Sequence, residues 1–292
     1  MDLNNIKGSI VALITPFKNG KLDESALRKL VNFHISNGTN ALLTTGTTGE
    51  TTTLTSNEHK RVIDVVIEEN NGCLPVIVGA GSNNPVEAIE YSLHAQKAGA
   101  NALLHVAGYY NRPSQNGLYA HFKMVHDACD LPIIIYNIPP RAVVDVKPLT
   151  MQKLAALPRI IGVKDATGDL IRPLQERQLI KNFNWLSGED ATAVAYNANG
   201  GNGCISVTAN IAPKLCAEVQ LACEEGNFKK ALEIQELLMP LHTALFEEPN
   251  PTGAKYAASL LGLCTQDCKV PLLPLEKTTQ QKIEKAMKDL NL

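Results

Sequence analysis

The stretch "IIGVKDATGDL", residues 160–170, combines a strand-like run with a lysine at the end of the run. Ile160 to Val163 are apolar or small, which is typical of a strand that is covered on both faces. Lys164 follows, and burying an ammonium group in apolar surroundings is so costly that proteins rarely do it without a partner or a purpose. The stretch therefore predicts a buried strand over 160–164, with "ATGDL" as the turn into the next helix.

Eight runs of this kind occur along the 292-residue chain, separated by segments with helical periodicity. The segment 85–99, for example, begins at a proline and ends at a glycine, as many helices do. Near-continuous apolar strands with helices between them indicate parallel pairing. The predicted strands are Ser9–Thr15, Ala41–Thr45, Pro75–Gly79, Ala102–Val106, Pro132–Tyr136, Ile160–Lys164, Asn184–Ser187 and Gly203–Val207.

Eight strand–helix units predict an α/β fold, a closed (β/α)8 TIM barrel. A doubly wound open sheet is the alternative, but no G-x-G-x-x-G motif follows the first strand. We therefore predict a barrel domain over residues 1–226 that carries the catalytic site, and a helical C-terminal extension over residues 227–292. After residue 211 the predicted helices are Pro213–Gly226, Asn227–Phe246, Thr252–Leu261 and Thr278–Leu290.

The composition favours a soluble protein of the cytoplasm. The 27 basic and 29 acidic residues nearly cancel, which gives no electrostatic attraction to nucleic acid or to an anionic membrane. No basic region precedes a long apolar run at the N-terminus, and no run reaches the roughly 20 residues of a membrane helix. The seven cysteines form no C-x-x-C pair and are predicted to be reduced. The seven histidines form no metal-like cluster and are expected at the surface or in helices, so neither a metal nor another cofactor is predicted.

Barrel enzymes place their chemistry at the carboxyl ends of the strands. Lys164 ends the sixth strand, and taken alone such a lysine is most often the first solvated residue of a loop. An apolar barrel mouth instead favours the neutral amine, which is a nucleophile toward carbonyls. Tyr136 ends the fifth strand, where it is either a half-buried aromatic with a wet hydroxyl or a proton carrier for imine formation.

Three further segments carry groups suited to anions. The "GTTGE" loop, residues 46–50, is either a turn whose hydroxyls cap the backbone or a cradle of N–H and hydroxyl donors for a carboxylate. Arg141 is either a surface arginine or a fixed fork for a second carboxylate. The glycine-rich "GGNGCIS", residues 200–206, either binds phosphate or approaches a small substrate closely. Together these groups predict imine chemistry on a 2-keto acid, followed by enamine attack on an aldehyde.

Four motifs in this order resemble the dihydrodipicolinate synthase family, within the pyruvate-dependent class I aldolases that also include N-acetylneuraminate lyase. They are "GTTGE" (46–50), "YYNRPSQ" (109–115), "YNIPPR" (136–141) and "GVKDATG" (162–168). The resemblance implies condensation of pyruvate with L-aspartate 4-semialdehyde to 4-hydroxy-tetrahydrodipicolinate, an entry step to diaminopimelate and lysine. "GTTGE" and Arg141 favour the synthase over the lyase.

The resemblance also assigns catalytic roles. Lys164 matches the lysine that forms the Schiff base with pyruvate, and Tyr136 matches a tyrosine that relays protons to it through Thr47. Tyr110 matches a tyrosine that completes the relay from a neighbouring subunit. The resemblance therefore implies a homo-oligomer, usually a dimer of dimers, which is a tetramer.

The remaining assignments concern binding. Thr48 matches the threonine that holds the pyruvate carboxylate, and Arg141 matches the arginine that receives the carboxylate of the semialdehyde. Gly188 and Ile205 match positions whose backbone lines the pocket. Four residues match a site where lysine inhibits some members of the family: Asn83, Glu87, Tyr109 and His59. Ser56 stands where some lysine-sensitive members have a histidine, and Thr51 and Thr52 also differ, so feedback inhibition by lysine is a hypothesis.

Three other functions are compatible with parts of this pattern. A related pyruvate aldolase acting on a sugar acid, such as 2-keto-3-deoxygluconate, would share the imine lysine. A pyridoxal phosphate enzyme could use a barrel lysine, but no matching motif is present. A catalytically idle barrel could sense keto acids or lysine, and the presence of every expected catalytic side chain argues against it.

Overall fold

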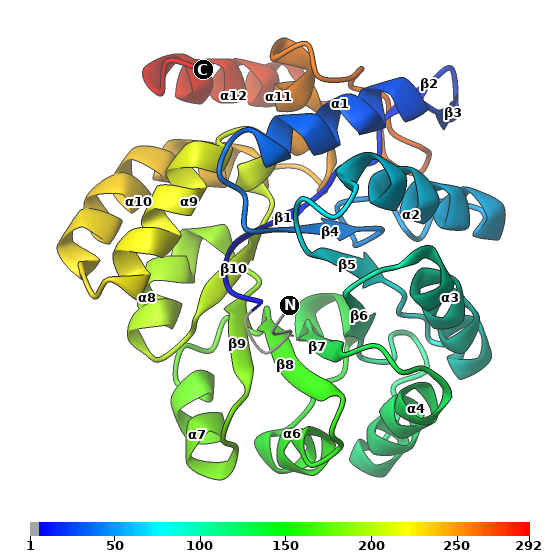
Figure 1. Cartoon of the computed structure of the whole chain (residues 1–292). Coiled ribbons are helices and arrows are strands. Elements are labelled where there is room, and N and C mark those ends of the chain that lie inside the picture. Colours follow the sequence, from blue (N-terminus) through cyan, green and yellow to red (C-terminus); the bar gives the residue numbers. More distant parts are fainter. Residues whose placement is uncertain (1–5) are drawn as a thin grey trace.

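The computed structural model of the chain describes residues 6–292, and a closed barrel of parallel strands forms its centre (Figure 1). Each barrel strand pairs in parallel with both of its neighbours, so closure leaves no free strand edge. The predicted (β/α)8 barrel is confirmed. In spatial order the strands are β1 (Gly8–Ala12), β10 (Gly203–Ser206), β9 (Asn184–Ser187), β8 (Ile160–Asp165), β7 (Ile133–Asn137), β6 (Ala102–Val106), β5 (Val76–Gly79) and β4 (Ala41–Thr44).

Helices with clear start and stop signals surround the barrel. Thr55 and Glu58 form a capping box at the start of α2, and Gly99, with φ +97°, ends α3. Residues 1–5, part of the N-terminal stretch in which the sequence predicts no targeting segment, lie outside the described residues. The surrounding helices are α1 (Glu24–Ile35), α2 (Ser56–Asn70), α3 (Pro85–Ala98), α4 (Gln115–Ala128), α6 (Pro148–Ala155), α7 (Arg172–Leu179), α8 (Ala193–Ala198) and α9 (Pro213–Glu224).

Several short elements were not predicted from the sequence. They follow barrel strands and shape the carboxyl end of the barrel. They are the ribbon β2 (Phe17–Lys18) and β3 (Lys21–Leu22), the short helix α5 (Pro139–Ala142), and the 3-10 turns η2 (Asp190–Thr192) and η3 (Thr208–Asn210).

The helical C-terminal extension consists of α10 (Phe228–Ala244), α11 (Thr252–Leu260) and α12 (Lys277–Asp289). In Figure 1, α11 and α12 lie beside α1, where Lys29 Nζ donates a hydrogen bond to the Gly262 carbonyl at 2.7 Å. None of the helices within residues 6–292 is long and apolar enough to cross a membrane. All seven cysteines are free thiols, as predicted.

The core has an inner and an outer layer because side chains alternate along each strand. In β7, Ile134 and Tyr136 pack inside the barrel, whereas Ile133 and Ile135 pack in the layer between strands and helices. In β8, Val163 belongs to the outer layer. Its neighbour Lys164 therefore points into the barrel.

One expectation about the histidines is wrong. His105 is fully buried on strand β6, rather than at the surface or in a helix. Its Nε2 lies 3.1 Å from the hydroxyl of Ser92 on α3, which satisfies one ring nitrogen between the sheet and the helix. Burial lowers the pKa of His105 to about 3, and the resulting neutral ring can be packed there without a counterion.

Candidate active site

Lys164 and Tyr136 lie side by side at the carboxyl end of the barrel. They are register partners on β8 and β7, and the Lys164 Nζ lies 4.3 Å from the centre of the Tyr136 ring. Their exposed fractions are 6% and 7%. The sequence left open whether Lys164 is the first solvated residue of a loop. The structure shows a buried amine against an aromatic face.

Gly188, at the end of β9, makes room for this amine. A Cβ at position 188 would lie 3.2 Å from Lys164 Cε, 2.8 Å from the Ala166 Cβ and 3.1 Å from the Asp165 carbonyl oxygen. The Gly188 amide donates to that same carbonyl at 2.7 Å, so the backbone cannot easily move away. The close approach of β9 to Lys164 thus requires glycine.

Asp165 is not the counterion of Lys164, although it is the adjacent acidic residue in the sequence. Its side chain accepts hydrogen bonds from the Thr167 amide at 2.9 Å and the Tyr196 hydroxyl at 3.4 Å. Burial raises the pKa of Asp165. Within residues 6–292 no carboxylate forms an ion pair with Lys164.

The "GTTGE" loop, which follows β4, is a compact turn. The Gly49 amide donates to Gly46 O at 3.0 Å and the Glu50 amide to Thr47 O at 3.1 Å. Thr47 is half-buried, whereas Thr48 is 3% exposed and its hydroxyl accepts a hydrogen bond from Asn250 Nδ2 at 3.0 Å. The turn thus presents two hydroxyl groups in the region between β4 and the C-terminal extension.

A cavity of about 480 Å³ opens beside the loop. Its lining brings together Thr47, Arg141 and Tyr109, which come from the ends of three different strand–helix connections. Arg141 lies on the short helix α5 and is exposed. An exposed guanidinium at the wall of a half-apolar cavity can receive a carboxylate from solvent.

Two of the four residues matched to lysine inhibition, Glu87 and Tyr109, line this same cavity. Glu87 accepts a hydrogen bond from the Ser82 hydroxyl at 2.5 Å. The other two, Asn83 and His59, do not line the cavity. The His59 ring, however, stacks on the ring of Tyr91 with 4.1 Å between ring centres, and Tyr91 does line the cavity.

The remaining contacts at these positions are local. Burial lowers the pKa of His59 to about 4, so its ring is neutral near neutral pH. The Thr51 hydroxyl lies 3.2 Å from His59 Nδ1. Asn83 accepts a hydrogen bond from Asn111 through its backbone carbonyl.

Tyr110 does not join the other candidate residues within the single chain. Its side chain is 87% exposed, and its backbone has φ +64°. Among the described residues no hydrogen bond connects Tyr110 to Thr47 or to Tyr136. A large aromatic that is so exposed, on a backbone rarely adopted by tyrosine, is typical of a residue that contacts another molecule.

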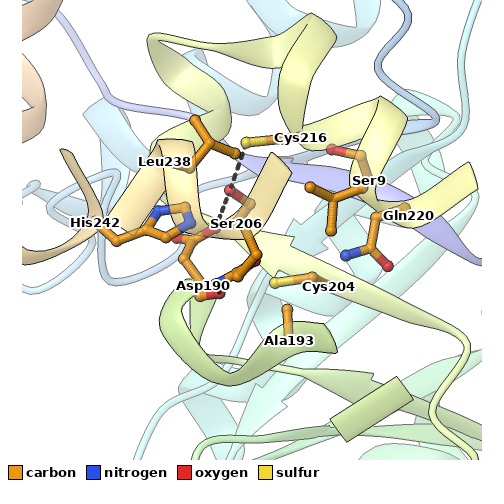
Figure 2. Close-up of a pocket in the computed structure, with 11 residues that line it drawn as sticks. Ser9, Asp190, Ala193, Cys204, Ser206, Cys216, Gln220, Leu238 and His242 are labelled. Atoms are coloured by element: carbon orange, nitrogen blue, oxygen red, sulfur yellow. Dashed lines mark hydrogen bonds between the residues drawn. The ribbon is translucent and has the colours of Figure 1, made fainter. Parts of the chain in front are cut away.

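Ile205 is 1% exposed and packs inside the barrel on β10. Behind β10, the Asp190 carboxylate accepts a hydrogen bond from the Ser206 hydroxyl (Figure 2). It also accepts a hydrogen bond from the Val207 amide at 2.8 Å. The cavity in this cluster measures about 10 Å³, room for a single water and not for a substrate. The cluster therefore fixes the end of β10 rather than forming a second site.

One glycine of "GGNGCIS", Gly203, is required by the packing of the barrel itself. A Cβ at Gly203 would lie 2.7 Å from the backbone N and O of Gly8 on β1. The close approach is therefore to a neighbouring strand, and neither the phosphate nor the substrate interpretation is needed to explain Gly203.

Sequence reasoning missed three features near the site. Burial raises the pKa of Glu189, while the charges of Lys164 and Arg141 act in the opposite direction, so this carboxyl lies within electrostatic range of both. Asn250 contacts Thr48, and no pattern in the sequence indicated it. Lys255 is fully buried in α11, and its position within "TGAKYAASL" carries the same signal as Lys164, a lysine in an apolar run.

The fold and the lysine at a strand end, buried and in no ion pair with another described residue, define a barrel enzyme of the class I aldolase type, which is a lyase. The model of the Dihydrodipicolinate synthetase family matches residues 5–290, and the chain belongs to this family.

Known relatives resemble the chain over nearly its whole length. The 4-hydroxy-tetrahydrodipicolinate synthase of Brucella suis is 56% identical over 290 residues, which cover 98% of this chain and 99% of the relative. The chloride-inhibited dihydrodipicolinate synthase of Acinetobacter baumannii, solved with pyruvate, is 42% identical with a TM-score of 0.96, covering 98% and 99% of the two chains. The enzyme of Cyanidioschyzon merolae, solved with lysine bound, is 35% identical with a TM-score of 0.95, covering 98% of both.

Proposed function

We propose that the chain condenses pyruvate with L-aspartate 4-semialdehyde to 4-hydroxy-tetrahydrodipicolinate, in the pathway to diaminopimelate and lysine. The observation that carries the proposal is the Lys164 amine, which is buried against the Tyr136 ring and forms no ion pair with a carboxylate of residues 6–292. The match to the synthase family over residues 5–290 supports the choice of substrates. The free cysteines support a location in the reducing cytoplasm.

The Nζ of Lys164 attacks the carbonyl carbon of pyruvate, and the carbonyl oxygen leaves as water to give an imine. Loss of a methyl proton turns the imine into an enamine, whose carbon attacks the aldehyde of the semialdehyde. The amino group of the second substrate then displaces Lys164 and closes the ring. In this proposal Tyr136 carries protons in these steps together with Thr47, and the 4.3 Å between the Lys164 Nζ and the centre of the Tyr136 ring supports the role of the tyrosine.

Binding of the two substrates is assigned to opposite sides of the amine. Thr48 and the amides of the "GTTGE" turn hold the carboxylate of pyruvate, while Arg141 receives the carboxylate of the semialdehyde from the cavity. Gly188 and Ile205 line the pocket through their backbones. A carboxylate at each end would place the aldehyde over the enamine.

The exposed Tyr110 supports a homo-oligomer, proposed as a tetramer, in which this side chain completes the proton relay of a neighbouring subunit. Asn83, Glu87, Tyr109 and His59 form the proposed site for feedback by lysine. Sedimentation of the purified protein tests the first proposal. Initial rates across millimolar lysine test the second, and unchanged rates would remove it.

Borohydride reduction with and without pyruvate, followed by mass mapping of peptides, tests the imine. The expected result is one reduced pyruvate adduct, on the peptide that contains Lys164, formed only when pyruvate is present. An adduct on another lysine, or none, contradicts the proposal. Arg141→Ala should still form the adduct but raise the KM for the semialdehyde, and equal loss of both functions would refute the role of Arg141.

A further inference from the structure

A second lysine, Lys255 on α11, is buried more completely than Lys164. Its exposed fraction is 0%, and its Nζ forms an ion pair with the carboxylate of Glu50, whose side chain is also 0% exposed. Glu50 is the last residue of the "GTTGE" turn. The ion pair therefore joins the C-terminal extension directly to the loop that carries Thr47 and Thr48.

Every polar atom of this pair has a partner. The Lys269 amide donates to the second oxygen of Glu50 at 2.9 Å. Lys255 also donates to the Asp267 carbonyl at 2.6 Å, and its Nζ lies 4.1 Å from the centre of the Phe17 ring. The carboxylate of Glu50 is therefore held from two sides, by α11 and by the segment that follows it.

The position of Glu50 determines the shape of the turn. Its backbone has φ +56°, and its amide donates to the Thr47 carbonyl, which closes the turn over the two threonines. Five residues before Lys255, Asn250 donates to the Thr48 hydroxyl at 3.0 Å. The segment 250–255 thus contacts the turn at two residues, Thr48 and Glu50, which lie on either side of Gly49.

Stability alone does not account for a fully buried ion pair. The desolvation of two charges offsets most of their attraction, and well-packed apolar residues of similar volume are often as stabilising. A buried ion pair instead fixes the position of the segments that it joins, because the carboxylate can reach a buried cation in only one arrangement of the chain. A fixed position matters here because a shift of the hydroxyl groups by about 1 Å weakens catalysis strongly.

We propose that Lys255 and Asn250 are positioning residues for pyruvate. Through Glu50 and Thr48, they set the hydroxyl groups of the "GTTGE" turn at the distance from Lys164 that the keto acid requires. The C-terminal extension thereby becomes part of the pyruvate site without touching the substrate. This inference rests on the proposed function, which assigns the turn to pyruvate.

The test uses the full-length protein and two variants. Glu50→Gln/Lys255→Met removes both charges and keeps the volumes, while the glutamine oxygen can still accept from the Lys269 amide. Asn250→Ala removes only the contact with Thr48. For each, the expected result is a rise of about tenfold in the KM for pyruvate, the scale of one lost hydrogen bond, with the KM for the semialdehyde unchanged.

Tyr256→Phe is the matched control. It loosens the same helix by removing the hydrogen bond from Tyr256 to Glu284 on α12, but it does not touch the turn. Its KM for pyruvate should stay at the wild-type value.

Three results would overturn the proposal. They are an unchanged pyruvate KM in the folded double variant, an unchanged pyruvate KM in Asn250→Ala, and a Tyr256→Phe variant that shows the same rise. If the double variant does not fold, Asn250→Ala decides the question. Failure of the proposed function is separate, because the wild type itself would then give no pyruvate adduct on Lys164.

Discussion

Lys164 and Lys255 are both buried lysines, yet their surroundings differ in one respect. Lys255 has a carboxylate, a carbonyl oxygen and an aromatic ring around its ammonium group. Lys164 has the ring of Tyr136, and no ion pair joins it to a carboxylate within residues 6–292. Both lie in apolar runs of the sequence, one at the end of a strand and the other inside a helix.

The two lysines differ in the way expected of a structural lysine and of the lysine proposed to be the nucleophile. A partner carboxylate keeps an ammonium group charged and occupied, so its lone pair is not available to attack a carbonyl. For an amine without such a partner, the protonated form receives less electrostatic stabilisation, and the lone pair is available to form a covalent bond. Burial alone therefore does not make a lysine a candidate nucleophile, whereas burial with no ion pair among residues 6–292 does.

The largest effect is expected from Lys164→Met, which keeps the volume and removes the amine. Turnover should fall at least about 10⁴-fold, as for loss of a nucleophile elsewhere, and the borohydride adduct should disappear. Stability should not fall, because no ion pair between Lys164 and another described residue is broken. Residual turnover near the wild-type level would mean that another lysine forms the imine, and the contrast with Lys255 would fail.

Lys255→Met should have the opposite outcome. It leaves Glu50 as a buried carboxylate with no counterion, and such a change costs about 3–5 kcal/mol of unfolding free energy. Urea unfolding at a fixed protein concentration measures the loss. The fraction that remains folded should still form the pyruvate adduct on Lys164. A variant as stable as the wild type would show that the pair is not desolvated as the structure indicates.

Glu176, a buried acid, extends the comparison to carboxyl groups. It is 0% exposed and accepts a hydrogen bond from Trp185 Nε1 at 3.2 Å. Its Oε1 lies 3.9 Å from Arg172 Nη1, and the same arginine also forms an ion pair with Asp145. Burial, with a further contribution from the charge of Asp165, raises the pKa of Glu176 from 4.5 to about 7. Among the described residues, by contrast, the carboxylate of Glu50 shares its ion-pair partner Lys255 with no other carboxylate.

The sign of the resulting pH effect follows from the raised pKa. The stability that neutral Glu176 contributes is fully present below pH 4.5 and is lost as the pH rises through about 7. Glu176→Gln, which stays neutral, should therefore gain on the wild type across this window, by up to about 3 kcal/mol. Urea unfolding of both proteins at several pH values measures the difference. A difference that does not change with pH would contradict the assignment.

The sequence predicted most of the barrel because the determinants are local. Apolar runs such as Ile133–Tyr136 predict strands, and the motif around Lys164 predicts an amine at the end of a strand. That no carboxylate of residues 6–292 forms an ion pair with Lys164 could not be predicted, because the neighbouring Asp165 turns outward only when the strand alternation is set by packing.

The contacts of the C-terminal extension were also beyond the sequence. Lys255 and Glu50 are separated by 205 positions, and the sequence around either residue does not predict that the other is its partner. The same holds for Asn250 and Thr48. Such pairs are fixed only when the extension folds back over the barrel.

The smallest effect is expected at Gly188, where the comparison can be altered without removing either lysine. In Gly188→Ala the new methyl group would lie 3.2 Å from Lys164 Cε and 2.8 Å from the Ala166 Cβ, so the amine must shift. Overpacking of this kind costs about 1–3 kcal/mol, and kcat/KM for pyruvate should fall about tenfold. Gly117→Ala, on the helix α4 away from the barrel interior, is the matched control and should leave kcat/KM unchanged. Equal values for both variants would mean that the position of Lys164 tolerates crowding, and that the missing counterion alone makes this lysine reactive.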